Sequence, residues 1–280
     1  MADRILLPLD GSPMAESILP QAQRLLEKRD AELILVRAVH LIPATDVDYG
    51  LLVAELQEQA EKYLGTIEKR LRAEGLRVRS VAMQGPPADV ITEVAQTDKA
   101  SMIVMGTHGR TGLARLLFGS VTELVLRRAK CPVFLVRTTE GAPPPVKGRL
   151  FGRILVPVGA GELSLKVLDV VKEFARPHDA RVLLLHVVED NPLNPHWNFP
   201  SGELKLAADR LSTATIPCQT VFRKGEAARE ILAAAKEEDA DLIAMTTHGR
   251  RGVPRWILGS VTEKVLRAAP VPMLVVSAKA

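Results

Sequence analysis

The sequence has few cysteines and no long apolar run. Its 280 residues include two cysteines, Cys131 and Cys218, and neither belongs to a C-x-x-C pair, so a disulfide framework is excluded. No apolar stretch approaches the roughly 18 residues of a membrane-spanning helix. The first residues place Asp3 and Pro8 where a secretory signal needs a basic flank and an unbroken apolar stretch. We therefore expect a cytoplasmic protein with no membrane segment.

Aromatic residues and clustered charge are also scarce. Aromatic side chains make up 4% of the chain, which leaves few platforms on which the bases of a single strand could stack. Lys and Arg together number 37 against 33 Asp and Glu, a formal net charge of +4. The basic residues are scattered instead of forming a run or patch. We therefore expect no specific binding of nucleic acid.

Arrangements typical of catalytic sites are missing from the sequence. It has no H-x-x-x-H pair for a metal, no G-K-[ST] of a Walker phosphate loop, and no visible set of nucleophile, base and orienting residue. A G-x-G at Gly159 and Gly161 lacks the third glycine of a dinucleotide fingerprint, and we interpret it as a turn. Rapid catalysis is therefore not expected, whereas slow hydrolysis of a nucleotide stays open.

One stretch of the sequence occurs twice. Residues 101–137 and 241–277 align at an offset of 140 with 19 identities in 37 positions, and RILLPLDGS at 4–12 matches RILVPVGAG at 153–161. Three consecutive prolines stand between the repeats, where they continue neither a helix nor a strand. The predicted organisation is a first domain at 1–138, a proline-rich linker at 139–151 and a second domain at 152–280.

Short apolar runs alternate with helical patterns along each repeat. The first repeat predicts strands at 4–9, 33–39, 78–83, 102–105 and 133–137, and helices at 12–29, 52–74, 87–98 and 120–129. Because the apolar runs are continuous, both faces of each strand are expected to be buried. This order predicts the α/β class: two tandem open five-stranded parallel sheets with helices on both faces, a Rossmann-like arrangement. The second repeat has a shorter second helix, around 203–213.

Two loops are candidates for a ligand site. In an open parallel sheet, ligands bind beyond the carboxyl ends of the strands, where the strand order reverses. The segments Pro8–Ser12 and Gly106–Gly109 meet this description if the first and fourth strands are neighbours. Glycines let the backbone approach a ligand closely, and the helix that opens at Ser120 offers free amides to an anion. A simpler alternative is that Ser120 and Glu123 form a capping box and Ser120 only caps its helix.

The glycine spacing carries a resemblance. Gly106-x-x-Gly109, then nine residues, then Gly119-Ser120 resembles the ATP-binding motif G-x2-G-x9-G-[ST] of the universal stress protein family. The Pro8–Ser12 start and the strand at Cys131-Pro132-Val133 are also similar to that family, and the resemblance covers both repeats. It implies a tandem member with the universal stress protein fold, a stress-response or regulatory role, and ATP as the ligand, with or without magnesium.

The resemblance also implies roles for individual residues. Asp10 and the backbone near Ala38 would hold the adenine, Gly106 and its neighbours would lie along the ribose, and the residues from Gly109 and from Gly119 onward would bind the phosphates. The predicted nucleotide-binding residues are Pro8, Leu9, Asp10, Ala38, Met105, Gly106, Thr107, His108, Gly109, Arg110, Gly119, Ser120, Val121 and Thr122. No catalytic residue is assigned, and the metal ligands are left open.

The second repeat departs from this motif at two positions. Gly159 stands at the position of Asp10, so the carboxylate is absent. Thr246 stands at the position of Gly106, so a β-branched side chain projects where the backbone would approach the ligand. We therefore predict that the first domain binds the nucleotide and that the second binds it weakly or not at all.

Two other classes of function remain open at this stage. One is an interaction scaffold that binds no nucleotide, and the other is an adenylate-forming or slowly ATP-hydrolysing enzyme on a similar sheet. In the family, the last strands of two domains pair. The resemblance therefore implies that Val133–Arg137 pairs with Met273–Ser277 within the chain, while a homodimer of chains stays open.

Overall fold

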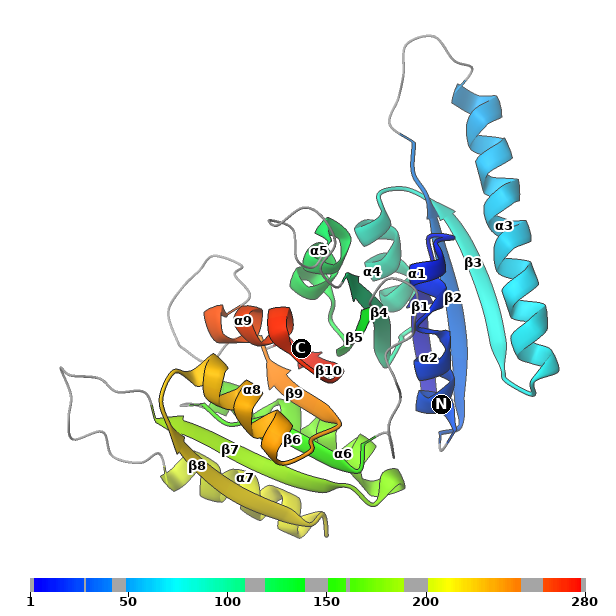
Figure 1. Ribbon diagram of the computed structural model, residues 1–280. Coiled ribbons are helices and arrows are strands. Elements are labelled where there is room, and N and C mark those ends of the chain that lie inside the picture. Colours follow the sequence, from blue (N-terminus) through cyan, green and yellow to red (C-terminus); the bar gives the residue numbers. More distant parts are fainter. Residues whose placement is uncertain are drawn as a thin grey trace. The chain divides into compact units, whose positions relative to one another are not determined.

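The structure, a computed structural model, comprises two compact units (Figure 1). Residues 1–133 and 138–144 form unit 1, and residues 134–137 and 145–280 form unit 2. The described residues are 3–27, 29–41, 49–108, 119–138, 151–159, 162–188, 201–247 and 259–277. The predicted linker at 139–151 therefore lies outside the described residues except for its last residue, Phe151.

Unit 1 is built on parallel strands in the order β3-β2-β1-β4. Strand β1 (Asp3–Pro8) pairs on one side with β2 (Ala31–Val39) and on the other with β4 (Met102–His108), and β3 (Val78–Gln84) pairs with β2. Ile5, Leu6 and Leu7 of β1 have no exposed surface, because helices cover both faces of the sheet. The predicted parallel α/β architecture and the adjacency of the first and fourth strands are confirmed. Strand β5 (Val133–Thr138) has residues in both units.

The helices of unit 1 follow the predicted order, with one break. Ser12 caps the first helix through its Oγ, which accepts a hydrogen bond from the Ala15 amide at 3.1 Å, and Pro13 is the first helical residue. The single helix predicted for 12–29 is wrong: it is two helices, because Pro20 has no amide with which to continue the hydrogen-bond ladder. The helices are α1 (Pro13–Glu16), α2 (Leu19–Leu26), α3 (Tyr49–Ala73), α4 (Pro87–Thr97) and α5 (Ser120–Arg128).

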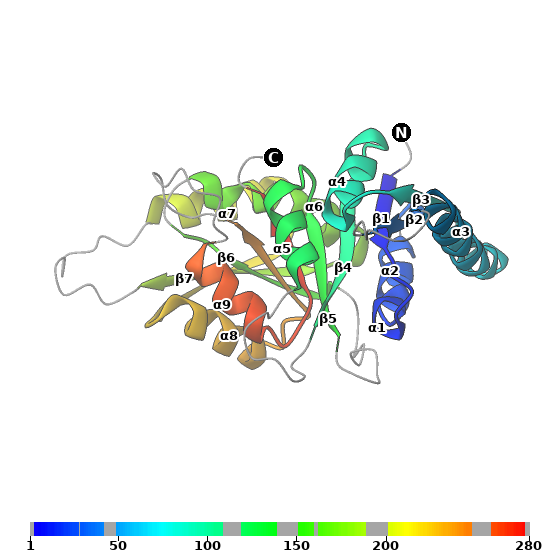
Figure 2. The same ribbon diagram turned by 90° about the horizontal axis from the view of Figure 1, so that it is seen from above.

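Unit 2 repeats the plan, with parallel strands in the order β10-β9-β6-β7-β8. Figure 2 shows α6 and α7 on one face of this sheet and α8 and α9 on the other. The strands are β6 (Arg153–Pro157), β7 (Arg181–Val188), β8 (Cys218–Lys224), β9 (Leu242–Thr246) and β10 (Met273–Val276). The helices are the 3-10 turn η1 (Glu162–Leu165), α6 (Val167–His178), α7 (Ser201–Thr213), α8 (Ala227–Glu237) and α9 (Ser260–Ala268).

Helix α7 is about half as long as its counterpart α3, with 13 residues against 25, as the sequence predicts. None of the helices in the described part of the chain combines the length and the apolar character that a bilayer crossing requires.

Candidate nucleotide site

The strand order of unit 1 reverses between β1 and β4. From β1 the chain continues outward to β2 and β3, then returns to β4 on the other side of β1. Because β1 and β4 are neighbours, the connections that follow them run in opposite directions. A crevice forms between these connections at the carboxyl edge of the sheet.

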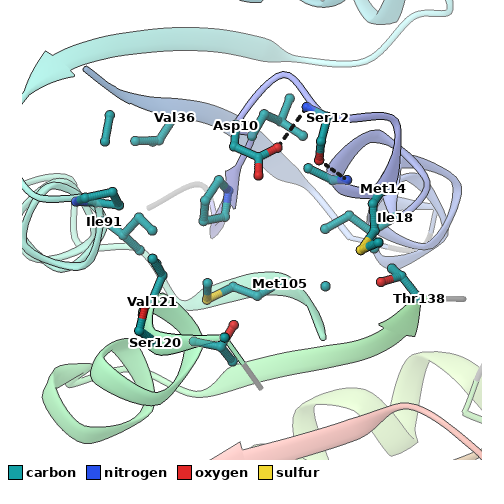
Figure 3. Close-up of a pocket in the computed structure, with 18 residues that line it drawn as sticks. Asp10, Ser12, Met14, Ile18, Val36, Ile91, Met105, Ser120, Val121 and Thr138 are labelled. Atoms are coloured by element: carbon teal, nitrogen blue, oxygen red, sulfur yellow. Dashed lines mark hydrogen bonds between the residues drawn. The ribbon is translucent and has the colours of Figure 1, made fainter. Parts of the chain in front are cut away.

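A pocket of about 390 Å³ occupies this crevice (Figure 3). Its wall is mainly apolar and contains a few hydroxyl groups and one carboxylate, that of Asp10. The lining residues are Pro8, Leu9, Asp10, Ser12, Met14, Ala15, Ile18, Val36, Ala38, Pro87, Ile91, Met105, Gly106, Gly119, Ser120, Val121, Thr122 and Thr138. Among these described residues no side chain is cationic, so a bound anion would be met here by main-chain amides and hydroxyl groups.

The Asp10 carboxylate is held in place by a tight turn. Its Oδ1 accepts a hydrogen bond from the Ser12 amide at 2.8 Å. Gly11, between them, has a φ of +88°, and a Cβ there would lie 3.3 Å from the guanidinium of Arg37. Glycine is needed at this position because other residues rarely adopt such a φ and because the cation lies so close. The turn fixes one oxygen of Asp10 and leaves the carboxylate at the rim of the pocket.

Arg37 and Tyr63 support this turn from outside the pocket. The Arg37 guanidinium lies 4.8 Å from the centre of the Tyr63 ring, and the Tyr63 hydroxyl donates to Glu16 at 2.9 Å. Burial and this hydrogen bond raise the pKa of Tyr63 above its usual range. Because successive strand residues face opposite ways, Arg37 points away from the pocket that Val36 and Ala38 line.

Helix α5 begins at the opposite wall of the pocket. Its N-cap residue is Gly119, with a φ of +72°, and Ser120 is the first helical residue. The capping box proposed for Ser120 is therefore wrong: the cap position holds no side chain, and the Glu123 carboxylate pairs with Arg127 instead. The first amides of a helix have no acceptor within it. The start of α5 thus presents main-chain donors toward the pocket.

Most of the predicted residues lie together. The pocket includes Pro8, Leu9, Asp10, Ala38, Met105, Gly106, Gly119, Ser120, Val121 and Thr122. Gly106, expected in a loop, lies inside β4, which continues to His108. Thr107 is buried and outside the lining, and its carbonyl accepts a hydrogen bond from Thr138. The side chain of His108, together with Gly109 and Arg110, lies outside the described residues.

Part of the pocket wall was not predicted from the sequence. Met14 and Ile18 come from the broken helix after β1, Val36 and Thr138 come from the strands β2 and β5, and Pro87 and Ile91 come from the start of α4. One signal was available: in a parallel sheet the carboxyl ends of all strands meet at the same edge. The end of β5 was therefore a candidate alongside those of β1, β2 and β4.

The two cysteines are free and half-buried. Burial raises the pKa of the Cys131 thiol to about 11 and also raises the pKa of Cys218. Since the thiolate is the nucleophile, neither side chain is activated at neutral pH. In the described parts of the chain, no three His, Cys, Asp or Glu side chains gather in a way that would hold a metal ion.

The pocket and the repeated fold agree with the sequence profile of the universal stress protein family, which matches residues 1–137 and 150–277. The chain belongs to the universal stress protein family. Universal stress protein Rv2623 of Mycobacterium tuberculosis is 25% identical over 291 residues, which cover 97% of this chain and 95% of that protein. The crystal structure of a universal stress protein from Archaeoglobus fulgidus has a TM-score of 0.76 and 25% identity, and covers 98% of this chain and 96% of the other.

Some members of the family bind nucleotides. One similar structure is a universal stress protein in complex with cAMP, with 21% identity, a TM-score of 0.38, and coverage of 46% of this chain and 98% of the other. The finding describes that protein.

In this universal stress protein, the second repeat folds the same edge differently. The Gly259 amide donates to the Thr247 carbonyl at 2.9 Å, and the Thr262 hydroxyl donates to the Thr246 carbonyl at 3.1 Å. A Cβ at Gly259 would lie 2.9 Å from the Thr247 oxygen. The Gly259 amide and the Thr262 hydroxyl, both at the start of α9, are therefore bonded to the end of β9.

Proposed function

We propose that this universal stress protein binds one adenine nucleotide, ATP, in the pocket of unit 1 and acts as a nucleotide-dependent stress-response or regulatory protein. The observation that carries the proposal is the convergence of Asp10 and the start of α5 on one pocket. A volume of about 390 Å³ is within the range of about 300–1,000 Å³ that small-molecule sites occupy. The mainly apolar wall suits a base, and the helix start suits a phosphate.

The roles proposed for individual residues follow from their chemistry. Asp10 would accept hydrogen bonds from the adenine amino group or a ribose hydroxyl, because a carboxylate repels phosphate. Ala38 would lie against the base. Gly119 and the three residues after it would hold the phosphates, together with Gly109 and Arg110 of the connecting segment. Magnesium, where present, would be carried mainly by the phosphates, since it is often bound through one or two carboxylates and the phosphates of the substrate.

Unit 2 is proposed to bind nucleotide weakly or not at all. It lacks the carboxylate, because Gly159 replaces Asp10. Its counterpart amide at Gly259 is already bonded to Thr247. Losing one hydrogen bond costs roughly 0.5–1.5 kcal/mol, up to about tenfold in affinity. The expected stoichiometry is therefore one nucleotide per chain. A cytoplasmic location, the pairing of Val133–Arg137 with Met273–Ser277, and a homodimer stay predictions.

The test places a negative charge at the start of each repeated helix. Ser120→Asp should weaken ATP binding by at least about tenfold in calorimetry on the full chain, because like charges in contact cost several kcal/mol. Ser260→Asp is the matched control in the other repeat and should leave the affinity within about twofold. An aspartate in the first turn favours a helix, so both variants should fold. Absence of heat with wild-type protein, or equal effects of the two variants, would contradict the proposal.

Two outcomes point to the other classes of function. Protein that carries no nucleotide after purification and gives no calorimetric signal fits the interaction scaffold. AMP and pyrophosphate formed from labelled ATP would indicate adenylate chemistry.

A further inference from the structure

Thr138, the last residue of β5, holds an unusual position at the pocket. Its side chain is almost fully buried, and its hydroxyl donates to the Thr107 carbonyl at 2.9 Å. Its methyl group lies 3.2 Å from the point that a Cβ on Gly106 would occupy. Thr138 also lines the pocket, opposite Asp10 (Figure 3). One side chain thus touches the end of β4 and the ligand site.

The corresponding carbonyl in the second repeat has a different partner. Thr247 aligns with Thr107, and its carbonyl accepts the amide of Gly259, which aligns with Gly119. Gly119 and Thr107 are both described, and no hydrogen bond joins them. The two glycines also differ in conformation: φ is +72° at Gly119 and −53° at Gly259, with ψ near 140° in both. The amide at the start of the helix is therefore bonded to the strand-end carbonyl in the second repeat (a closed helix start) and not in the first (an open helix start).

The two repeats also differ in sequence at the two positions that surround this carbonyl in the first repeat. Position 138 aligns with Ala278, which has no hydroxyl, and Gly106 aligns with Thr246. Each repeat therefore has one threonine at these two positions: Thr138 in the first repeat and Thr246 in the second. A Cβ at Gly106 would crowd the methyl groups of Thr138 and Ile18, at 3.2 and 3.4 Å, so that one of them would have to shift. In the second repeat, Thr246 stands at the glycine position and the Thr247 carbonyl accepts the Gly259 amide.

We propose that Thr138 is a positioning residue that keeps the start of α5 open. Its hydroxyl donates a hydrogen bond to the Thr107 carbonyl. Without this bond, that carbonyl would accept the Gly119 amide, as the Thr247 carbonyl accepts the Gly259 amide. Gly119 is able to adopt either conformation because glycine takes positive and negative φ with similar ease. The consequence for ligand binding rests on the proposed function, since the freed amide is a donor for a phosphate.

Two variants separate the hydroxyl from the bulk of the side chain. Thr138→Val keeps the shape and removes the donor, whereas Thr138→Ser keeps the donor and removes the methyl group. The first measurement is amide hydrogen exchange of Gly119 by NMR on the full chain without nucleotide, with Gly259 as the internal reference for a bonded amide. We expect Gly119 to exchange faster than Gly259 in the wild type and in Thr138→Ser, and to become protected in Thr138→Val.

The second measurement is ATP affinity by calorimetry on the same variants. Thr138→Val should weaken binding by up to about tenfold, the effect of one lost hydrogen bond, and Thr138→Ser should stay near the wild type. Unchanged exchange of Gly119 in Thr138→Val, or the same protection in both variants, would overturn the role of Thr138. If the wild type binds no ATP, the proposed function fails, and the exchange measurement still decides whether Thr138 keeps the amide open.

Discussion

Asp241 shows how one aligned position can act differently in the two repeats. It aligns with Ser101, and each residue precedes a strand and contacts the first strand of its own unit. The Ser101 hydroxyl donates to the Arg4 carbonyl at 3.0 Å, whereas the Asp241 carboxylate accepts the Arg153 amide at 3.0 Å. Burial raises the pKa of Asp241 to about 6, partly offset by hydrogen bonds from the backbone of residues 151–153. Unit 2 therefore contains an acid that titrates close to neutral pH.

The raised pKa of Asp241 predicts a pH dependence of stability. Between about pH 4 and pH 6 the folded state keeps this proton and the unfolded state, with a pKa of about 3.9, has released it. The contribution of Asp241 to the free energy of unfolding should thus fall as the pH rises through this window and stay level above it. Urea unfolding from pH 4 to 7.5 should show this slope in the wild type and lose it in Asp241→Asn.

The exposed neighbour Asp239 supplies the control for that experiment. Its carboxylate is paired with Arg153 at 3.4 Å, and its side chain is 85% exposed. Asp239→Asn should keep the wild-type slope between pH 4 and 6. Parallel curves for the wild type and Asp241→Asn would show that Asp241 titrates normally in the folded protein.

At the scale of single residues, the sequence predicted what depends on local backbone and missed what depends on packing. The spacing of Gly106, Gly119 and Ser120 was informative because a strand end and a helix start are local structures. The contributions of Met14, Ile18 and Thr138 were not visible, because they arise where separate elements pack around the pocket. The role of Ser120 as a cap was wrong because Gly119, with a φ of +72°, holds the cap position before it.

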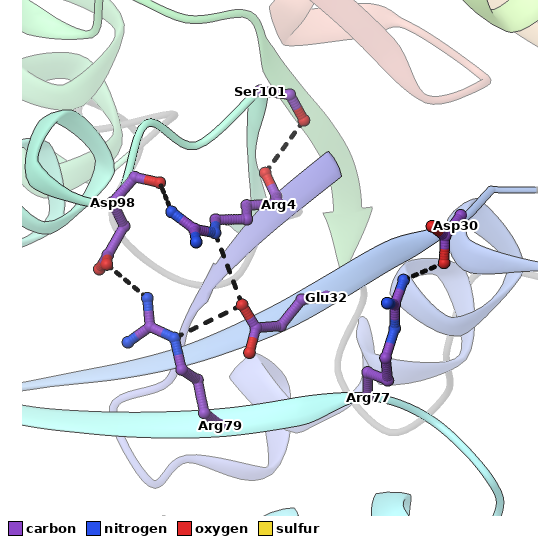
Figure 4. Close-up of polar contacts among 7 residues, drawn as sticks. All are labelled: Arg4, Asp30, Glu32, Arg77, Arg79, Asp98 and Ser101. Atoms are coloured by element: carbon purple, nitrogen blue, oxygen red, sulfur yellow. Dashed lines mark hydrogen bonds and ion pairs between the residues drawn. The ribbon is translucent and has the colours of Figure 1, made fainter. Parts of the chain in front are cut away.

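At the scale of elements, an ion-pair network joins the amino ends of three strands to a helix (Figure 4). Glu32 of β2 lies 3.6 Å from both Arg4 of β1 and Arg79 of β3. Arg79 also bonds to Asp98 at the end of α4, at 2.5 Å, and Arg4 donates to the Asp98 carbonyl at 2.7 Å. The hydrogen bond to Asp98 raises the pKa of Arg79. The network lies at the edge opposite the pocket and ties the sheet together there.

Removal of Glu32 should destabilise unit 1 more than removal of an isolated surface carboxylate. Glu32→Gln leaves Arg4 and Arg79 close together without the shared anion, and we expect a loss of about 1 kcal/mol in urea unfolding, smaller at high salt. Asp30, which pairs only with Arg77 in Figure 4 and has a side chain 86% exposed, provides the comparison. Asp30→Asn should change stability by less than about 0.5 kcal/mol. Equal losses would mean that the network adds nothing.

The elements themselves were largely predictable. Continuous apolar runs identified the strands because both of their faces are buried, and Gly75, with a φ of +86°, ends α3 as expected. Several boundaries shifted by one to three residues, and two of the differences have a structural cause. The break between α1 and α2 follows from Pro20, whose effect the apolar pattern concealed, and β4 continues past Met105 through a glycine that looked like the start of a loop.

At the scale of the whole molecule, the division into units does not coincide with the division into repeats. Phe134–Arg137 belong to the first repeat by sequence and to unit 2 by structure. In unit 2 the Phe134 ring lies 5.9 Å from that of Phe151, centre to centre, and Phe151 in turn lies 5.0 Å from Phe174. Phe134 has no exposed surface. The sequence showed two copies of one plan, but it could not show that a strand of one copy supplies core to the unit that holds the other.

Phe134 should therefore stabilise mainly the unit that contains the second repeat. Phe134→Ala removes a fully buried ring and should cost about 3–5 kcal/mol, as large-to-small core substitutions of this kind do. The aligned residue in the second repeat is Leu274, so Phe134→Leu is the milder comparison and should cost less. Hydrogen exchange should report lower protection in β6 and β9 than in β1 and β2, because local opening follows the unit that has lost core contacts. Greater loss in β1 and β2 would assign Phe134 to the first unit instead.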